Sequence, residues 1–239
     1  MRRLAFSPPL PQKSRAFLND ASLAMTDFAA ARRHMVDGQV RTADVTNLRL
    51  LAAMQELPRE RFLPASVASL AYLDLDVPVG AGRRLLKPMV LAKLIQALDL
   101  TGTEHVLDVA CAGGYGAAVL AHLAGDVVAL EEDAALAKAA TAALAGQANV
   151  SVVSGPLVAG WAPGGPYDAI LIEGATEVPP QALFRQLKEG GRLACVLGAG
   201  PGAKAMLYCR TDDDIGGRAI FDAAAAVLPG FVKPAEFAF

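Results

Sequence analysis

Residues 106–120 read VLDVACAGGYGAAVL, an apolar run that ends in an acid and leads through very small residues into helix-forming sequence. Small side chains let backbone N–H groups approach a ligand, and the N-terminus of a following helix favours negative charge. The next apolar run ends in LEED, which places Glu131 where a carboxylate can accept hydrogen bonds from both hydroxyls of a ribose. Asp108, the turn and Glu131 together predict a nucleoside-binding site. Taken singly, the turn could be a plain corner and Glu131 a solvated acid.

The spacing within the turn indicates which nucleoside it would bind. No GxGxxG fingerprint of a dinucleotide site follows the first strand, which argues against a nicotinamide-dependent oxidoreductase. Ala110, Ala112 and Gly114 stand instead where a DxGxGxG-type turn has its glycines, and the acid at its head suits a cationic ligand better than a pyrophosphate. This pattern resembles motif I of the class I S-adenosylmethionine-dependent methyltransferases. The resemblance implies S-adenosylmethionine as cofactor, bound around Asp108, Ala110, Cys111, Ala112, Gly113, Gly114, Tyr115, Glu131, Glu132, Gly155 and Pro156. For Tyr115, core packing is an equally good interpretation.

The elements that must position these residues alternate between strand and helix. The apolar runs predict strands at 105–109, 127–130, 150–153, 168–172, 192–197 and 204–209. Helices are expected at 88–100, 115–123, 134–144 and 179–187. Apolar strands joined by single helices predict an α/β, doubly wound, mostly parallel sheet with an antiparallel edge, and the methyltransferase resemblance implies seven strands in a Rossmann-like arrangement. We expect residues 1–24 to be a disordered extension and residues 25–239 a single domain, with a helical cap over 25–100 and the cofactor-binding core over 101–239.

Composition excludes several classes of function. The 239 residues are 54% hydrophobic with a formal net charge of −2, so no basic stripe favours a nucleic-acid partner. No apolar run approaches the roughly 20 uncharged residues that a membrane span needs. The cysteines Cys111, Cys195 and Cys209 are scattered, without a CxxC pair, and are interpreted as reduced core thiols rather than metal ligands. We therefore expect a cytoplasmic protein with no metal site, no membrane partner and no nucleic-acid partner.

The order and spacing of longer segments resemble one family, the protein-L-isoaspartate O-methyltransferases. The resemblance runs from about residue 34 to 210. It is carried by HMVDGQVR, PRERFLP, AYLDLDVPVG, KPMVLAKLIQAL, VLDVACAGGYGAAVLA, VVALEED, PYDAILIEGATEVPPQAL and QLKEGGRLACVLG. It implies methyl transfer from S-adenosylmethionine to a carboxylate of damaged aspartyl residues in protein. A protein or peptide substrate is then expected and a small molecule is possible, while the oligomeric state stays open.

Three departures from the family pattern surround the expected site. Leu86 stands where the family has a serine thought to lie beside the methyl-accepting carboxylate, and a carboxylate buried beside leucine would lack a donor. Pro156 replaces an acid that the family uses on the adenine side of the cofactor. Glu173 ends a strand where the family has a small or hydroxyl residue, and an ionised acid there would repel a carboxylate. We therefore predict a changed acceptor with Glu173 as a general base or cation-binding group, while a solvated Glu173 that caps the following turn is an equally good interpretation.

Two hypotheses about function follow. The first is an active methyltransferase of this family or a relative with a changed acceptor. The second is a catalytically degenerate relative that binds cofactor or a partner protein without methyl transfer, which Leu86 and Pro156 favour. The C-terminal sequence after Arg210 departs from the family most. Because Phe231, Phe237 and Phe239 need burial, we expect the tail to pack on the domain or on a partner subunit, so that truncation at Gly230 alters melting temperature or oligomer mass.

Overall fold

The computed structural model describes residues 27–212 and 214–233, and the extension expected over residues 1–24 lies outside them. The helices are α1 (Phe28–Met35), α2 (Leu48–Glu56), α3 (Pro88–Ala97), α4 (Tyr115–Ala121), α5 (Ala134–Ala143) and α6 (Gln181–Phe184). The strands are β1 (Val77–Gly80), β2 (Arg83–Leu85), β3 (His105–Val109), β4 (Asp126–Glu131), β5 (Val150–Ser154), β6 (Tyr167–Thr176), β7 (Leu187–Leu197), β8 (Lys204–Thr211) and β9 (Asp214–Asp222).

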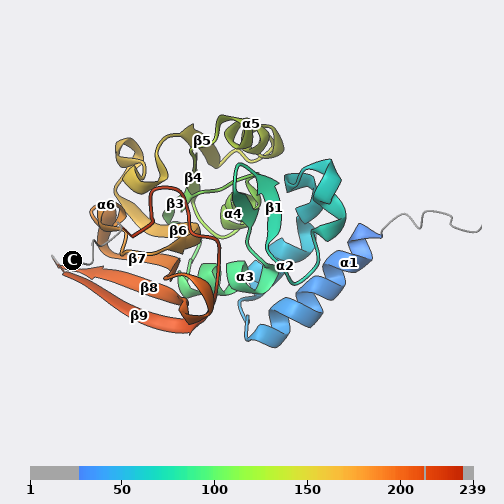
Figure 1. Cartoon of the computed structure of the whole chain (residues 1–239), viewed down its shortest axis with the longest axis horizontal. Helices are drawn as coiled ribbons and strands as arrows, with labels where there is room; N and C mark the ends of the chain where they lie inside the picture. The colour runs from blue at the N-terminus through green and yellow to red at the C-terminus, as the bar shows by residue number, and fades with distance from the viewer. Residues whose placement is uncertain (1–26, 213, 234–239) are drawn as a thin grey trace, which may run out of the picture.

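The main sheet has seven strands in the order β5-β4-β3-β6-β7-β8-β9 (Figure 1). Strands β3 to β7 pair in parallel, whereas β8 is antiparallel to β7 and β9 is antiparallel to β8. The chain runs outward from β3 to β5 and then returns to the other side of β3 with β6. The strand order therefore reverses between β3 and β6, which is where such sheets bind ligands. The predicted doubly wound sheet with an antiparallel edge is confirmed.

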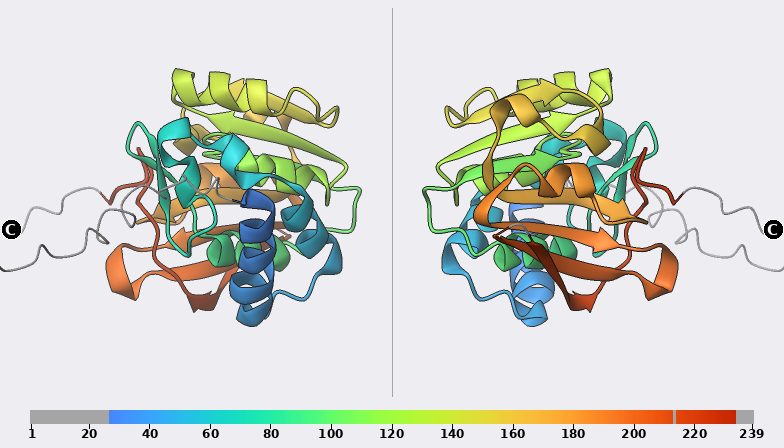
Figure 2. Two further views of the ribbon diagram at one scale, coloured as in Figure 1. Left: turned by 90° about the vertical axis from the view of Figure 1, so that its right-hand side faces the viewer. Right: turned by 90° about the vertical axis from the view of Figure 1, so that its left-hand side faces the viewer.

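Apolar cores lie on both faces of this sheet, because successive side chains of a buried strand point to opposite sides (Figure 2). In β3, Val106 belongs to the core shared with α3, α4 and the N-terminal segment, while Leu107 and Val109 belong to the other. Asp108 follows the same alternation and faces the first core. Because side chains alternate along β3, Asp108 lies on the side of the sheet that the N-terminal segment covers.

The N-terminal segment contains helices, as expected, but it is not helical throughout. Besides α1, α2 and α3 it contains the antiparallel hairpin β1–β2, in which Val77 pairs with Leu85. The turn has positive φ at Gly80, Ala81 and Gly82 (107°, 50° and 70°), and two glycines make that geometry accessible. Periodicity of 3.6 residues could not find these short strands. Their alternating burial is visible only once the hairpin packs on the sheet.

One prediction was wrong near the C-terminus. The helix expected over 179–187 is only the short α6, because Leu187 already pairs with Tyr167 as the start of β7. Strand β7 then passes through Gly190, whose φ of 71° marks an irregularity in the strand. A turn at Asp212 comes after β8. Strand β9 follows it and pairs with β8 along its whole length.

The segment after β9 returns along the carboxyl end of β6. Val227 forms a parallel bridge with Ala175, and the backbone N–H of Leu228 donates to the Ala175 carbonyl at 2.9 Å. Phe231 is 3% exposed and packs in the second core, which confirms the expected burial of this residue on the domain. Phe237 lies outside the described residues, as does Phe239.

Phe231→Ala is expected to lower the free energy of unfolding by about 3 kcal/mol, because it removes a buried aromatic ring and leaves a cavity. Urea denaturation followed by far-UV circular dichroism measures this loss. Val232→Ala is the matched control, since its side chain is 59% exposed and should change stability by less than about 0.5 kcal/mol. Equal effects of the two substitutions would contradict the packing of this segment.

Candidate active site

Three acids lie in a row on one face of the sheet, at the carboxyl ends of adjacent strands. Asp108 of β3 pairs with Ala129 of β4 and with Leu171 of β6. Glu131 is two residues beyond Ala129 and Glu173 two residues beyond Leu171, so period-two alternation puts all three acids on the same face. Their exposed fractions are 0%, 0% and 2% for Asp108, Glu131 and Glu173. The row crosses the point where the strand order reverses.

The small-residue turn after β3 is held in an unusual backbone conformation. Ala110, Ala112 and Gly114 have φ values of 71°, 50° and 91°. The N–H groups of Ala110 and Cys111 both donate to the Leu130 carbonyl, at 2.9 and 3.2 Å. A left-handed conformation costs an alanine roughly 1–2 kcal/mol, so neighbouring contacts must maintain this turn. The turn therefore has the shape that glycines would give it, and the two alanines retain that shape at a cost.

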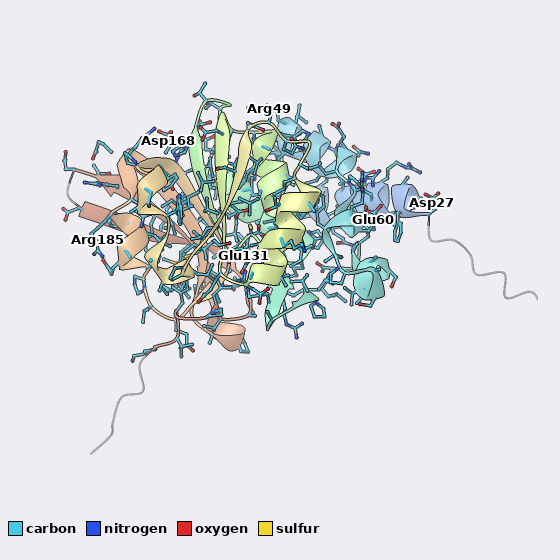
Figure 3. The ribbon with its side chains drawn as sticks, turned by 90° about the horizontal axis from the view of Figure 1, so that it is seen from above. Asp27, Arg49, Glu60, Glu131, Asp168 and Arg185 are labelled. Carbon is cyan, nitrogen blue, oxygen red and sulfur yellow. The ribbon has the colours of Figure 1, made fainter. Side chains whose placement is uncertain are left out.

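Glu131 lies near the centre of the molecule (Figure 3). One of its two carboxylate oxygens already accepts as many hydrogen bonds as it can. Its Oε1 accepts from Arg83 Nη1 at 3.0 Å and from the backbone N–H groups of Glu132 and Asp133 at 3.0 and 3.1 Å. Its Oε2 accepts from the Ala112 N–H at 2.8 Å. Because each carboxylate oxygen offers about two lone pairs, further hydrogen bonding is available only at Oε2.

Arg83 is the functional residue that sequence reasoning missed. It is 4% exposed and reaches from β2 across the sheet, where Nη2 also donates to the Ala110 carbonyl at 2.6 Å. Arg83 lies on the buried side of the hairpin and Arg84 on the exposed side, as alternation along a strand requires. The glycines at 80 and 82 were a sequence signal for the hairpin. Nothing in the sequence indicated that its arginine would meet Glu131.

The other two acids of the row face each other. None of the four carboxyl oxygens of Asp108 and Glu173 has a hydrogen-bond partner within residues 27–212 and 214–233, although the two buried groups lie close enough to interact. Two ionised carboxylates buried side by side without donors would be strongly unfavourable, so the pair must retain a proton. Burial raises the pKa of Asp108 to about 7, and burial followed by the charge of Asp108 raises the pKa of Glu173 well above its ordinary value. We therefore assign a shared proton to this pair.

Gly116 makes room for the Glu173 carboxyl. A Cβ on Gly116 would lie 2.1 Å from Glu173 Oε1, so any larger residue at the second position of α4 would displace the acid. The Glu173 side chain thus reaches back over the start of α4 toward Asp108. The expectation that Glu173 might be a solvated acid is wrong, because it is buried.

A buried arginine and tyrosine close the other side of the row. Arg59 donates from Nε to the Ala71 carbonyl at 2.7 Å and from Nη2 to the Leu86 carbonyl at 2.6 Å. Its guanidinium lies over the ring of Tyr115, 4.8 Å from the ring centroid, and burial lowers its pKa. Tyr115 is fully buried and contacts Phe62 edge-on, so it packs in the core, while its contact with a cofactor stays a prediction.

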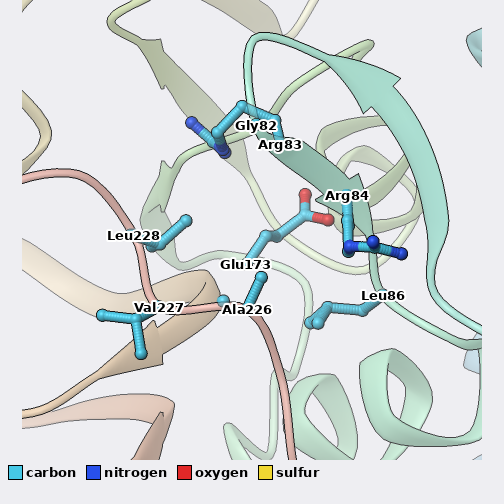
Figure 4. Close-up of a pocket in the computed structure, with 9 residues that line it drawn as sticks. Gly82, Arg83, Arg84, Leu86, Glu173, Ala226, Val227 and Leu228 are labelled. Carbon is cyan, nitrogen blue, oxygen red and sulfur yellow. The ribbon is translucent and has the colours of Figure 1, made fainter. Parts of the chain in front are cut away.

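A small cavity of about 10 Å³ borders Glu173, which is room for about one water molecule (Figure 4). The Glu173 side chain lies between Arg84 of β2 and Leu86, which follows that strand, on one side and the C-terminal segment with Ala226 and Leu228 on the other. Leu86 is 2% exposed and presents only carbon atoms to this space. Glu173 and Leu86, which sequence reasoning placed beside the acceptor, therefore border the same cavity.

The remaining residues predicted to bind the cofactor, Glu132, Gly155 and Pro156, lie near the Glu131 end of the acid row. The Gly155 N–H donates to the Glu131 carbonyl at 3.3 Å, and the site of a Gly155 Cβ lies 3.4 Å from the Trp161 ring. Pro156 is exposed, and so is the side chain of Glu132. Of the two acids in LEED that could bind a ribose, only Glu131 points into the site.

Two further searches gave negative results for the described part of the chain. No group of three or more His, Cys, Asp and Glu side chains there is placed to hold a metal ion. Within residues 27–212 and 214–233, no helix is long and apolar enough to cross a membrane.

The reversed strand order, the antiparallel edge and the turn headed by Asp108 define the fold as that of a Rossmann-like methyltransferase. Residues 30–222 match the family model for Protein-L-isoaspartate(D-aspartate) O-methyltransferase (PCMT), and the chain belongs to this family. Protein-L-isoaspartate O-methyltransferase 1 of Rhodopseudomonas palustris is 44% identical over 184 residues, covering 76% of this chain and 75% of that protein. A Methylorubrum populi protein-L-isoaspartate O-methyltransferase is 42% identical, covering 77% of this chain and 85% of the relative.

Solved structures share the fold. A protein-L-isoaspartate O-methyltransferase superposes with a TM-score of 0.72 at 24% identity, over 83% of this chain and 66% of that one. A beta-aspartate methyltransferase from Plasmodium falciparum, solved in complex with S-adenosyl-L-homocysteine, superposes with a TM-score of 0.66 at 18% identity. It matches 82% of this chain and 97% of its own.

The residues of the row fit S-adenosylmethionine. Asp108 offers a buried carboxyl without a cationic partner, which suits the positive groups of that molecule, and Glu131 offers a free lone pair at Oε2. The turn between them carries no side chain larger than that of Cys111. Arg83 and the backbone N–H groups of Glu132 and Asp133 constrain the fit, because they occupy Oε1 of Glu131 and leave a ribose only Oε2.

Arg83→Ala is expected to lower the free energy of unfolding by about 3 kcal/mol, because it leaves the Glu131 carboxylate buried without its cationic partner. Guanidinium denaturation measures the difference. Arg84→Ala, one residue away on the exposed side of the hairpin, should have little effect. If Arg83→Ala were as mild as the control, the ion pair would not hold the hairpin on the sheet.

Stability should also fall as the pH rises from about 4 to about 7. The unfolded chain releases the Asp108 proton near the ordinary value of 3.8, whereas the folded chain keeps it until about pH 7, so the folded state binds more protons in this window. Urea denaturation at pH 4.5, 6 and 7.5 measures the dependence. Asp108→Asn should make it shallower, and an unchanged slope would rule out a protonated Asp108.

Proposed function

We propose that the protein transfers a methyl group from S-adenosylmethionine to a carboxylate of altered aspartyl residues in protein or peptide substrates. The observation that supports this proposal is the acid row of Asp108, Glu131 and Glu173 in a chain of this family. In this row Glu131, which can accept a hydrogen bond from a ribose, lies next to Asp108, which can stabilise a cationic group. Residues 30–222, which match the family model, include the row and most of the cavity lining beside Glu173, whereas residues 226–228 of that lining lie beyond the match. S-adenosylmethionine, when bound, supplies an electrophilic methyl group on a positively charged sulfur.

Each residue of the site has a role in this proposal. Glu131 Oε2, which also accepts from the Ala112 N–H, holds the ribose end, with the turn between residues 110 and 114 close to the ligand. Asp108 lies where a cationic group would be stabilised, since its carboxyl is buried in a medium of low dielectric. Gly155 and Pro156 border the outer end, and the exposed Pro156 offers neither a carboxylate nor a backbone N–H.

The acceptor would approach through the cavity between Glu173 and Leu86. A carboxylate is already a nucleophile, so the step needs no base: one of its oxygens forms the C–O bond while the methyl–sulfur bond breaks and sulfur keeps the electron pair. The protein contributes orientation and exclusion of water. Because the cavity has room for about one water molecule, the hairpin β1–β2 or the segment at 226–228 must move to admit an aspartyl side chain.

A second candidate is cofactor binding without methyl transfer. It is favoured by the contact of Arg83 with Glu131, which closes the cofactor end, and by Leu86, which provides no donor at the acceptor end. A changed acceptor that needs Glu173 as a general base is less well supported. Burial raises the pKa of Glu173, and neither of its oxygens has a donor among the described residues, so an ionised carboxylate ready to act as a base is disfavoured there.

Calorimetry with S-adenosylmethionine and S-adenosylhomocysteine tests the cofactor site. Glu131→Gln is expected to weaken binding about 10-fold or more, because an amide replaces a charged acceptor that stays buried. Glu132→Gln should leave binding nearly unchanged, since its side chain is exposed. Equal weakening by the two substitutions would contradict the role of Glu131.

Transfer of labelled methyl groups to an isoaspartyl peptide then tests the activity, with the matching aspartyl peptide as control. Labelling of the isoaspartyl peptide alone is the expected result. Tight cofactor binding with no labelling of either peptide would favour the second candidate.

A further inference from the structure

Glu173 presents an apparent contradiction with a carboxylate acceptor. It is 2% exposed, borders the cavity and stands beside Asp108, so an acceptor carboxylate would meet acidic side chains on one side and Leu86 on the other. Were Glu173 ionised, the approach of another negative charge in a buried site would be strongly unfavourable. The geometry must therefore either exclude carboxylates or keep Glu173 neutral.

Several observations indicate a neutral Glu173. Its two oxygens receive no hydrogen bond from any donor in the described residues, which would be very costly for a buried carboxylate. The nearby Asp108 carboxyl, which is also buried without a donor, further disfavours a negative charge on Glu173. Gly116, which lacks a Cβ, lets the acid reach this position. A protonated carboxyl has one O–H donor, and a buried carboxylic acid can use it to bind an anion.

The charged and titratable groups around Glu173 support the same state. Asp108 of β3 is the nearest, and Arg83 of β2 and Arg59 of the 3-10 helix Arg59–Phe62 exert weaker favourable effects on its charge. Tyr115 and Cys111 lie close enough to interact with it, and both are buried with raised pKa values. Residues 226–228, which also border the cavity beside Glu173, are apolar. Arg83 and Arg59 donate to Glu131 and to backbone carbonyls, and although Arg83 Nε and Arg59 Nη1 have no partner among the described residues, neither arginine forms an ion pair with Glu173.

We propose that Glu173 is a specificity-determining residue, a neutral carboxylic acid that donates a hydrogen bond to the acceptor carboxylate. This inference rests on the proposed function and names the group that recognises its acceptor. The hydrogen bond orients one acceptor oxygen and leaves the other free to attack the methyl group. Glu173 thus supplies a donor on the side of the cavity opposite Leu86, which has none. Asp108 holds Glu173 in place and keeps it protonated.

The test compares three chains for binding of an isoaspartyl peptide to protein saturated with S-adenosylhomocysteine, measured by calorimetry. Glu173→Gln keeps a donor in nearly the same shape and should bind the peptide within about threefold of the native protein. Glu173→Leu has no donor and should bind it at least about 10-fold more weakly, as expected for the loss of a hydrogen bond to a charged group. Glu189→Gln, at an exposed acid near the start of β7, is the matched control.

The pH dependence gives an independent readout. Peptide binding to the native protein should weaken as the pH rises above about 7, because the acid pair then loses protons and gains negative charge. Binding by Glu173→Gln should depend less on pH, since an amide does not titrate. Cofactor affinity and melting temperature, measured on each variant, establish that the chains compared are folded.

The outcomes separate this inference from the proposed function. If the native protein binds S-adenosylhomocysteine but not the isoaspartyl peptide, the proposed function fails. If it binds and methylates the peptide while Glu173→Gln is as impaired as Glu173→Leu, the function stands and the neutral donor is wrong. Methylation that strengthens with pH and is abolished in Glu173→Gln would instead identify Glu173 as a base.

Discussion

The site depends on one electrostatic constraint, the burial of three acids side by side on the same face of a sheet. Three ionised carboxylates at this spacing would be prohibitively unfavourable in a medium of low dielectric. The fold meets the constraint in two ways. Glu131 is neutralised by Arg83 and by backbone N–H groups, whereas Asp108 and Glu173 share a proton. The hairpin supplies Arg83, the strained turn supplies the Ala112 N–H, and Gly116 at the start of α4 leaves room for Glu173.

The departures from the family pattern form a connected set rather than isolated losses. Leu86 is apolar at the acceptor end, and Glu173 brings a carboxyl to the same cavity. Gly116 removes the side chain that would block Glu173, and Ala110 keeps the turn in the left-handed region where glycine is easier. Residues in mutual contact change together most readily, since each alone would leave a clash or an unpaired group. The set thus describes an altered site with its own internal consistency.

The parallel strands and the positions of the three acids could be predicted from the sequence. The residues that contact these acids could not. Uniform apolar runs specify buried parallel strands, and the alternation within them would have placed Asp108, Glu131 and Glu173 on one face once the pairing was known. Arg83 could not be found in this way, because its contact with Glu131 joins a three-residue strand to a distant one. Strand β9 and the return of the chain along β6 were missed for a similar reason: both are stabilised by pairing with distant segments rather than by a local pattern.

The protonation of the acid row is the central claim, and carbon-13 NMR of the carboxyl groups tests it most directly. Labelled Glu and Asp side chains, assigned by comparison with Glu131→Gln, Glu173→Gln and Asp108→Asn, would be titrated in the folded protein. The account predicts that at pH 6 the Glu173 carboxyl carbon has the shift of a protonated acid. A Glu173 that is ionised at pH 5 in the folded protein would contradict it.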